Sequence, residues 1–291
     1  MGKIVGAAFL SHHPGLMQNE ELRKLMGAGE DSDLIPGYAK IRQKIAEVKP
    51  DTVIIFDTHW FTTGFHLVEA SARIKGNFVS AEMPWYLFGV DYDYKGNPEL
   101  AHHINDAGIA SGVRVRSTAN EGMHQEYATI NIIKHLHLER LGISVVSASC
   151  CQNCRWDQFL PAGKTIAQGI ENSDARVLLI ASGALSHRFN NIDWQPVNPR
   201  IFHESNVSSP ENVASDKGAI RLMEQGKHGE IINNWESEYK KRNWEAFGGH
   251  YLQMIGALGG AHCTAKGTVM SDYENARGTG NVHIWFDVEQ Q

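Results

Sequence analysis

Residues 3–14 read Lys-Ile-Val-Gly-Ala-Ala-Phe-Leu-Ser-His-His-Pro, an apolar run that ends in two histidines and a proline. Residues 52–60 repeat the pattern, because the apolar stretch Val53 to Phe56 is followed by Asp-Thr-His-Trp. Short, continuous apolar runs are typical of parallel strands that are buried on both faces. Each run therefore predicts a buried strand whose carboxyl end delivers a histidine, His12 in the first and His59 in the second.

Apolar runs and amphipathic stretches alternate along the chain. Residues 38–48 carry apolar side chains at spacings of three and four, and Asn97-Pro98 is typical of a helix start. Such alternation predicts an α/β fold: a single domain, residues 1–291, with a central, mostly parallel sheet flanked by helices. We expect strands at 3–10, 52–57, 65–70, 113–117, 143–149, 176–182 and 283–288, and helices at 38–48, from 98 onward, and at 131–141, 157–171, 213–225, 229–239 and 245–258.

The composition excludes several classes of partner. The chain has 27 Lys and Arg against 33 Asp and Glu, a formal net charge of −6, and 42% hydrophobic residues. This balance gives no electrostatic reason to expect nucleic acid or an anionic membrane as partner. The chain has no long apolar stretch and its start does not have the form of a signal peptide, so we expect a cytoplasmic protein.

Three of the four cysteines form a C-C-x-x-C cluster, Cys150, Cys151 and Cys154, and Cys263 is distant in sequence. A structural zinc site usually has four ligands, and no second pair accompanies this one. We expect these cysteines to be buried and structural, with metal or redox chemistry as the alternative.

A third histidine and a carboxylate complete a candidate site. His187 lies just past the run that ends at Ser182, and Glu245 opens the helix expected at 245–258. In α/β sheets, ligands collect beyond the carboxyl ends of the strands. Two histidines and one carboxylate with open coordination positions are the donor set of non-haem Fe(II) oxygenases. Because the chain has 15 histidines, this set is a hypothesis until other motifs support it.

Four motifs in a fixed order supply that support. They are Ser-His-x-Pro at 11–14, Asp-Thr-His-Trp at 57–60, Val-Leu-Leu-Ile-Ala-Ser-Gly-Ala-Leu-Ser-His-Arg-Phe at 177–189 and Gly-Thr-Gly-Asn at 278–281. Together they resemble the class III extradiol ring-cleavage dioxygenases, which include the catalytic subunit of protocatechuate 4,5-dioxygenase. The resemblance covers nearly the whole chain. It implies an oxidoreductase that uses Fe(II) to insert both atoms of O2 into a catecholic ring.

The resemblance also implies roles for individual residues. His12 matches the first metal ligand rather than His13, because the family pattern is His, any residue, then Pro, and Pro14 sets that register. The other implied roles are His59 and Glu245 as metal ligands and His187 as the acid/base histidine.

One position departs from the commonest family pattern. Many members carry a second acid/base histidine in an Asp-His-Gly-Thr-like motif, whereas this chain has Glu-Tyr-Ala-Thr at 126–129. Tyrosine there resembles the 3,4-dihydroxyphenylacetate 2,3-dioxygenase and 2-aminophenol 1,6-dioxygenase branches, and it implies Tyr127 as a hydrogen-bonding helper. Weaker candidates that support the ligands are His13, Asp57, Trp60 and His124.

The preferred interpretation is therefore cleavage of 3,4-dihydroxyphenylacetate or a related substituted catechol to a muconic semialdehyde-type product. A 2-aminophenol-type ring cleaver, a zinc-dependent relative and a non-catalytic relative are the alternatives. The expected partners are a small aromatic substrate, O2 and further copies of the chain, or a paralogous subunit. A carboxylate on the substrate would need a basic partner, for which Arg188 and Arg200 are candidates.

Overall fold

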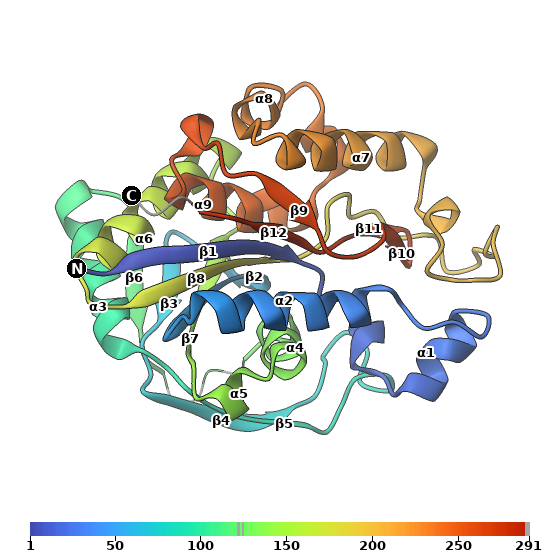
Figure 1. Cartoon of the computed structure of the whole chain (residues 1–291), viewed down its shortest axis with the longest axis horizontal. Coiled ribbons are helices and arrows are strands. Elements are labelled where there is room, and N and C mark those ends of the chain that lie inside the picture. The colour runs from blue at the N-terminus through green and yellow to red at the C-terminus, as the bar shows by residue number, and fades with distance from the viewer. Residues whose placement is uncertain (121–122, 124, 289–291) are drawn as a thin grey trace.

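The computed structural model describes residues 1–120, 123 and 125–288, which form an eight-stranded sheet with helices on both faces (Figure 1). The strand order is β6-β3-β7-β2-β8-β1-β12-β9. The four central strands, β7, β2, β8 and β1, are mutually parallel, and β12 and β9 extend one edge in antiparallel fashion. The predicted α/β class with a mostly parallel sheet is confirmed. The strands of this sheet are β1 (Lys3–Leu10), β2 (Thr52–Thr62), β3 (His66–Glu69), β6 (Val115–Thr118), β7 (Ser144–Cys151), β8 (Arg176–Ser182), β9 (Gly267–Val269) and β12 (Ile284–Phe286).

The sheet separates two apolar cores, because successive side chains of a strand point to opposite faces. In β8, Leu179 packs into the core beneath α3, α6 and α9, whereas Leu178 packs into the core beneath α2 and α4. Figure 1 shows α2 and α4 on one side of the sheet and α6 and α9 on the other. The helices are α1 (Glu20–Met26), α2 (Leu34–Val48), α3 (Pro98–Ser111), α4 (Tyr127–Leu136), α5 (Leu138–Leu141), α6 (Phe159–Glu171), α7 (Pro210–Glu224), α8 (His228–Asn233) and α9 (Gly249–Ala257).

The sequence located most of these elements. Strand β1 has the predicted bounds, and α3 begins at Pro98 with the Asn97 side chain accepting a hydrogen bond from Leu100 N at 3.0 Å. Strand β2 is longer than expected, since it runs to Thr62 and contains a register shift between Phe56 and Phe61. His59 therefore lies within the irregular part of β2 rather than beyond its end.

Three expected helices are wrong in extent. The helix expected at 131–141 is two, α4 and α5, which are separated at His137. The helix expected at 229–239 is the shorter α8, and the one expected at 245–258 begins only at Gly249. The four residues before α9 form a tight 3-10 turn in which Ala246 and Phe247 have φ of 47° and 60°. L-residues rarely adopt this left-handed conformation, at a cost of about 1–2 kcal/mol each. Glu245 therefore sits in a strained turn and not in the first turn of α9.

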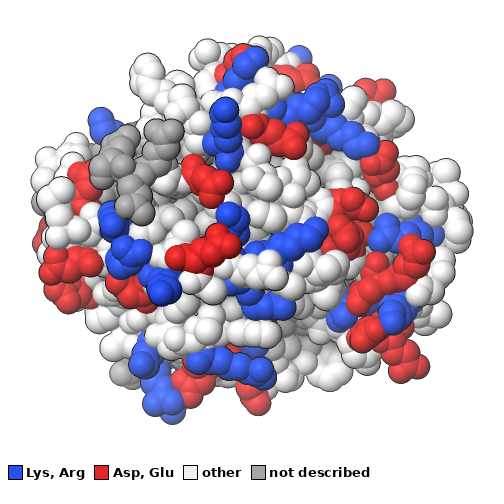
Figure 2. Space-filling model, viewed as in Figure 1, with Lys and Arg blue, Asp and Glu red and all other residues white. Residues whose placement is uncertain are grey.

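The sequence patterns also missed some elements. These are helix α1, strand β9 and two hairpins, β4–β5 and β10–β11, whose strands are β4 (Arg73–Phe78), β5 (Val90–Lys95), β10 (Glu274–Ala276) and β11 (Thr279–Asn281). Acidic and basic side chains are intermingled on the face shown in Figure 2. Within the described residues, every helix is too short or too polar to cross a bilayer.

Candidate metal centre

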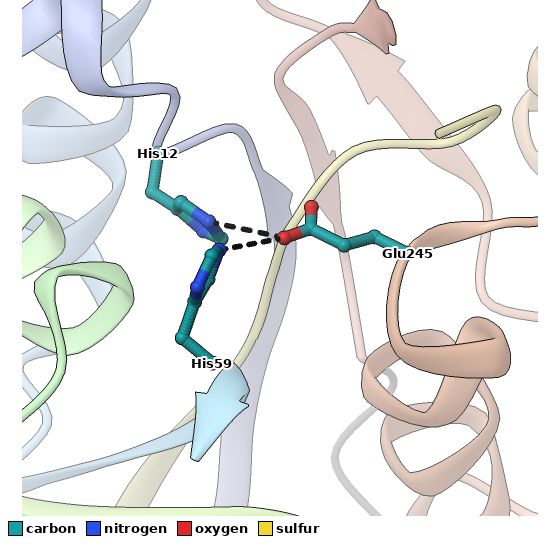
Figure 3. Close-up of side chains that lie close together, drawn as sticks. All are labelled: His12, His59 and Glu245. Atoms are coloured by element: carbon teal, nitrogen blue, oxygen red, sulfur yellow. Dashed lines mark ion pairs between the residues drawn. The ribbon is translucent and has the colours of Figure 1, made fainter. Parts of the chain in front are cut away.

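Three side chains from distant parts of the chain converge on one point (Figure 3). His12 follows β1, His59 lies in β2, and Glu245 reaches them from the turn before α9. The Nε2 atoms of His12 and His59 lie 3.4 and 3.1 Å from Glu245 Oε1. One ligand atom from each of the three lies within 4.8 Å of the others, and this is the only such group among the described residues. The geometry and the donor types fit a metal ion held on one face.

The surroundings of His12 leave one ring nitrogen free to bind a metal. Its Nδ1 lies 2.9 Å from Ser182 Oγ, and that hydroxyl donates to Ala128 O at 2.9 Å. Because the Ser182 proton is committed, Nδ1 must be the donor of the first bond. The lone pair then lies on Nε2, which faces Glu245, and such a partner orients a ligating histidine in many metal sites.

The main-chain turn that carries His12 is held from behind. Asn131 Nδ2 donates to His12 O at 2.8 Å, and Ser11 Oγ donates to Asn281 Oδ1 at 2.7 Å. Tyr38 OH also donates to Ser11 O. Asn281 closes the Gly-Thr-Gly-Asn motif, so this motif contributes to the position of His12.

Asp57 supports His59 through the main chain. Its Oδ1 accepts from the backbone N–H groups of His59 and Trp60 at 2.7 and 3.0 Å, and its Oδ2 accepts from Thr129 Oγ1 at 2.6 Å. These bonds fix the irregular part of β2, where ladder hydrogen bonds are interrupted. Asp57, expected among the residues that support the ligands, therefore acts on the backbone that orients the His59 ring.

Glu245 is a buried carboxylate, only 6% exposed, that is surrounded by donors. Thr58 Oγ1 donates to Oε1 at 2.8 Å, and Ala184 N donates to Oε2 at 2.6 Å. Burial raises the pKa of Glu245, but the nearby His12 and His187 and the hydrogen bonds lower it more, and the net pKa lies well below the usual value. Glu245 is therefore ionised over the whole physiological range.

The same charge acts on His59. Burial lowers the pKa of its imidazole, but the hydrogen bond and the negative charge of Glu245 outweigh burial and raise it. In the absence of metal, His59 thus holds a proton more tightly than a free imidazole does. A metal must displace this proton to bind.

His187 lies beside the three ligands but farther from them. Its Nε2 is 3.9 Å from Glu245 Oε1, its side chain is 25% exposed, and it does not belong to the three-ligand group. Its segment pairs with the segment that carries Glu245: His187 N donates to Asn243 O at 3.2 Å, and Glu245 N donates to Leu185 O at 3.2 Å. These bonds fix His187 and Glu245 relative to each other.

Tyr127 begins α4 and also reaches the centre. Its hydroxyl lies 2.8 Å from His59 Nε2, the atom that faces Glu245. Burial, with the negative charges of Glu245 and Glu82, raises the Tyr127 pKa well above its usual value. The phenol therefore keeps its proton and can act as a hydrogen-bond donor beside the ligand atoms.

The remaining candidates that the structure describes do not belong to the ligand group. The His13 ring is buried 6.1 Å from that of Phe202, and burial lowers its pKa to about 3. The side chain of Trp60 makes no hydrogen bond in the part of the chain described, and His124 lies outside the described residues. Arg200 Nη2 donates to the buried Glu274 carboxylate at 2.6 Å and to Asp31 O at 3.1 Å, so this nitrogen is held within the protein.

The cysteines are free thiols, and Cys150, Cys151 and Cys263 are buried. Burial raises the pKa of Cys150 and raises that of Cys154 to about 12, so these thiols stay protonated. No cysteine belongs to a metal-binding group among the residues described. The environment fits the expected structural role.

Sequence reasoning missed three exposed phenylalanines that are close in sequence to site residues, Phe61, Phe189 and Phe247. Each phenylalanine follows a site residue by two positions, and each is exposed, by 46%, 66% and 57% respectively. The rings of Phe61 and Phe247 lie 6.4 Å apart, and the Phe189 ring lies 4.8 Å from that of His187. The two-residue spacing was the available signal. Thr58 and Ser182 were also missed, although both are polar residues that close apolar runs.

Comparison with known proteins places these features in context. A family model described as the catalytic LigB subunit of aromatic ring-opening dioxygenase matches residues 6–287. A 3,4-dihydroxyphenylacetate 2,3-dioxygenase of Escherichia coli is 30% identical over 235 residues, 80% of this chain and 82% of that protein. The beta subunit of a Pseudomonas 2-aminophenol 1,6-dioxygenase is 25% identical over 97% of this chain and 93% of its own. The alpha subunit is 24% identical over 85% and 88%.

A solved structure supports the fold. The crystal structure of an uncharacterised protein from Escherichia coli K12 superposes with a TM-score of 0.64 at 17% sequence identity, and the match covers 97% of this chain and 99% of that one.

Replacing Glu245 with Gln should weaken binding of Co²⁺, used as a probe for divalent metals, by about 100-fold or more. The substitution removes the anionic metal ligand. It also turns an amide N–H toward Thr58 Oγ1 or Ala184 N, which are themselves hydrogen-bond donors. Titration calorimetry measures the affinity. The matched control is His66→Ala, a buried histidine outside the ligand group. Equal Co²⁺ affinity in the Glu245→Gln variant and the wild type would contradict the site.

Metal binding should release a proton from His59. Because the His59 pKa is raised in the metal-free protein, the protonated form competes with the metal, and Co²⁺ affinity should fall as pH drops from about 8 to about 6. Calorimetry in two buffers of different ionisation enthalpy counts the protons released. Identical heats in both buffers near neutral pH would show that His59 is already neutral. The His66→Ala control should not change the count, since burial lowers the His66 pKa to about 4.

Proposed function

The chain belongs to the LigB family of catalytic subunits of aromatic ring-opening dioxygenases, and from this premise we propose that it cleaves a substituted catechol with Fe(II). The carbon–carbon bond next to the two hydroxyl-bearing carbons breaks. Both atoms of O2 enter the product, one as aldehyde and one as carboxylate oxygen. The observation that carries the proposal is the convergence of His12, His59 and Glu245 on one point beside His187.

The donor set fits Fe(II), which would be held by His12, His59 and Glu245. When bound, the iron supplies open positions for the catecholate and O2 and the unpaired electrons that a closed-shell ring lacks. Two neutral imidazoles and one carboxylate leave the bound cation with net positive charge, which favours a deprotonated catechol hydroxyl. We propose this assignment for iron and retain zinc as an outcome of the test.

The residues around the ligands would move protons and hold the ring. His187 Nε2 would accept the proton of the second catechol hydroxyl and return a proton when the ring opens, because an imidazole titrates near neutral pH. Tyr127 would donate a hydrogen bond to the substrate or to oxygen. The exposed rings of Phe61, Phe189 and Phe247 would shield the site from water and contact the flat substrate ring.

The preferred substrate is 3,4-dihydroxyphenylacetate or a related substituted catechol. The E. coli relative that carries this name matches most of both chains, and Tyr127 replaces the second histidine as that branch suggests. A 2-aminophenol is the second candidate. It is supported by the Pseudomonas relative, which matches nearly the whole of both chains.

We further propose that residues 1–291 act as one catalytic domain, because β1 from the start of the chain pairs with β12 from its end. The protein would assemble with further copies or with a paralogous subunit. The two Pseudomonas subunits, both similar to this chain, support that proposal.

Oxygen uptake with a panel of substrates tests the function. The Fe(II)-loaded protein should consume O2 and form a yellow ring-opened product with 3,4-dihydroxyphenylacetate and 4-methylcatechol. Uptake with 2-aminophenol alone would replace the preferred substrate by the second candidate. Zinc in the purified protein, with no uptake after Fe(II) loading, would overturn the proposal.

Replacing His187 with Phe should leave Co²⁺ affinity nearly unchanged and lower kcat by about 10²–10⁴-fold. The imidazole lies 3.9 Å from the carboxylate and outside the ligand group, so its loss removes proton transfer rather than metal binding. The control His203→Phe changes a histidine in the segment before α7, whose ring nitrogen faces Ser205. Full turnover in the His187→Phe variant would show that another group moves the protons.

A further inference from the structure

Asp216 is a fully buried carboxylate on α7 that points at the segment carrying His187. Its two oxygens lie 3.1 and 3.2 Å from Ser186 N, and Oδ2 accepts from Ser186 Oγ at 2.6 Å. Tyr273 OH also donates to Oδ2, at 2.7 Å. The exposed fraction of Asp216 is 0%. Burying a carboxylate is costly unless donors surround it, so this contact is more than incidental packing.

Asp216 holds residues 184–187, and three of these four residues form hydrogen bonds to Glu245 or to the segment that carries it. Ala184 N donates to Glu245 Oε2, Leu185 O accepts from Glu245 N, and His187 N donates to Asn243 O. Ser186, the remaining residue, forms a bridge with Trp244 and directs its N–H and hydroxyl to Asp216. Asp216 therefore anchors the segment from the side opposite the metal centre.

We propose that Asp216 is a positioning residue, which acts through Ser186 to hold His187 and the Glu245 carboxylate in their working geometry. The inference rests on the proposed function for the part that concerns His187, whereas the part that concerns Glu245 depends only on metal binding. Outer partners of this kind typically change metal affinity or activity by about 10–100-fold when they are removed.

The site is shaped for an aspartate. A Cβ on Gly280 would lie 2.2 Å from both Asp216 Oδ2 and Tyr273 OH, so the residue of β11 beside the carboxylate must be glycine. Asparagine has the size of aspartate but offers one acceptor oxygen. If that oxygen takes the place of Oδ2 and serves Ser186 Oγ and Tyr273, the amide nitrogen faces Ser186 N–H, and two donors oppose each other.

The test is Asp216→Asn in the full chain, measured for Co²⁺ affinity by calorimetry and, after Fe(II) loading, for kcat and KM with 4-methylcatechol. We expect Co²⁺ affinity to fall by about 10-fold, kcat to fall by about 10-fold or more, and KM to change less than about 2-fold. A split between kcat and KM separates positioning from a general loss of folded protein. Wild-type Co²⁺ affinity together with wild-type kcat would overturn the inference.

Two controls separate the proposal from general destabilisation. Glu274→Gln disrupts another buried carboxylate, whose donors are Ser32 Oγ, Asp33 N and Arg200 rather than the 184–187 segment. The Glu274→Gln variant should have a lower melting temperature but the Co²⁺ affinity and kcat of the wild type. If its Co²⁺ affinity and kcat fall as much as those of Asp216→Asn, the role of Asp216 is limited to fold stability. Tyr273→Phe removes one donor to Asp216 and leaves the bonds from Ser186 N and Oγ to Asp216 in place, so we expect a smaller effect than that of Asp216→Asn. An equal or larger loss of kcat would place the anchor at Tyr273.

If the wild-type protein turns over no catechol, the two proposals remain distinguishable. If Co²⁺ affinity then falls in Asp216→Asn and is unchanged in Glu274→Gln, the positioning of Glu245 stands and only the proposed ring-cleavage function is overturned. If the wild-type protein cleaves catechols and the Asp216→Asn variant has the same Co²⁺ affinity and kcat, the proposed function stands and the role of Asp216 is overturned.

Discussion

The site depends on one buried negative charge, the carboxylate of Glu245. Its Oε1 is approached by the Nε2 atoms of His12 and His59, and a third imidazole lies slightly farther away. Taking such a charge out of water is unfavourable unless opposite charge and hydrogen bonds replace the water. Two protein donors and the imidazoles do so here, and a bound cation would do so more completely. The irregular part of β2 carries His59, and the turn before α9 carries Glu245, so two departures from regular structure bring His59 Nε2 to Glu245 Oε1.

The sequence predicts the part of this arrangement that depends on burial. Central strands that are buried on both faces appear in the sequence as continuous apolar runs. His12 and His59 are recognisable because each comes shortly after such a run. The β4–β5 hairpin was missed because the expected strands rested on continuous apolar runs, whereas residues of β4 and β5 alternate between exposed and buried positions. Such alternation is the pattern of a strand with one face toward water.

The turn at Glu245 was not predictable from local pattern. Residues 245–258 read as one helix, yet three consecutive residues, 246–248, adopt left-handed backbone conformations. Tertiary contacts impose this turn: Gly248 lies so close to Trp235 that a Cβ there would be 2.2 Å from the indole ring. Strained turns of this type persist only where the surroundings fix them, and they concentrate at functional sites. The family resemblance identified the residue, but only the fold explains how it reaches the site.

Adjacency in sequence was also a poor guide to contact. Asp57 lies two residues from His59 and binds its main chain, whereas Ser182, from another strand, holds the ring of His12. Tyr127 makes the most direct contact of all, since its hydroxyl lies beside the nitrogen of His59 that would bind metal. Whether that nitrogen carries a proton or accepts one from the phenol, it could not ligate a cation at the same time. Metal binding would therefore release the Tyr127 hydroxyl from His59. Because the pKa of Tyr127 is raised, the released phenol would keep its proton and serve as a hydrogen-bond donor to whatever binds beside the ligands.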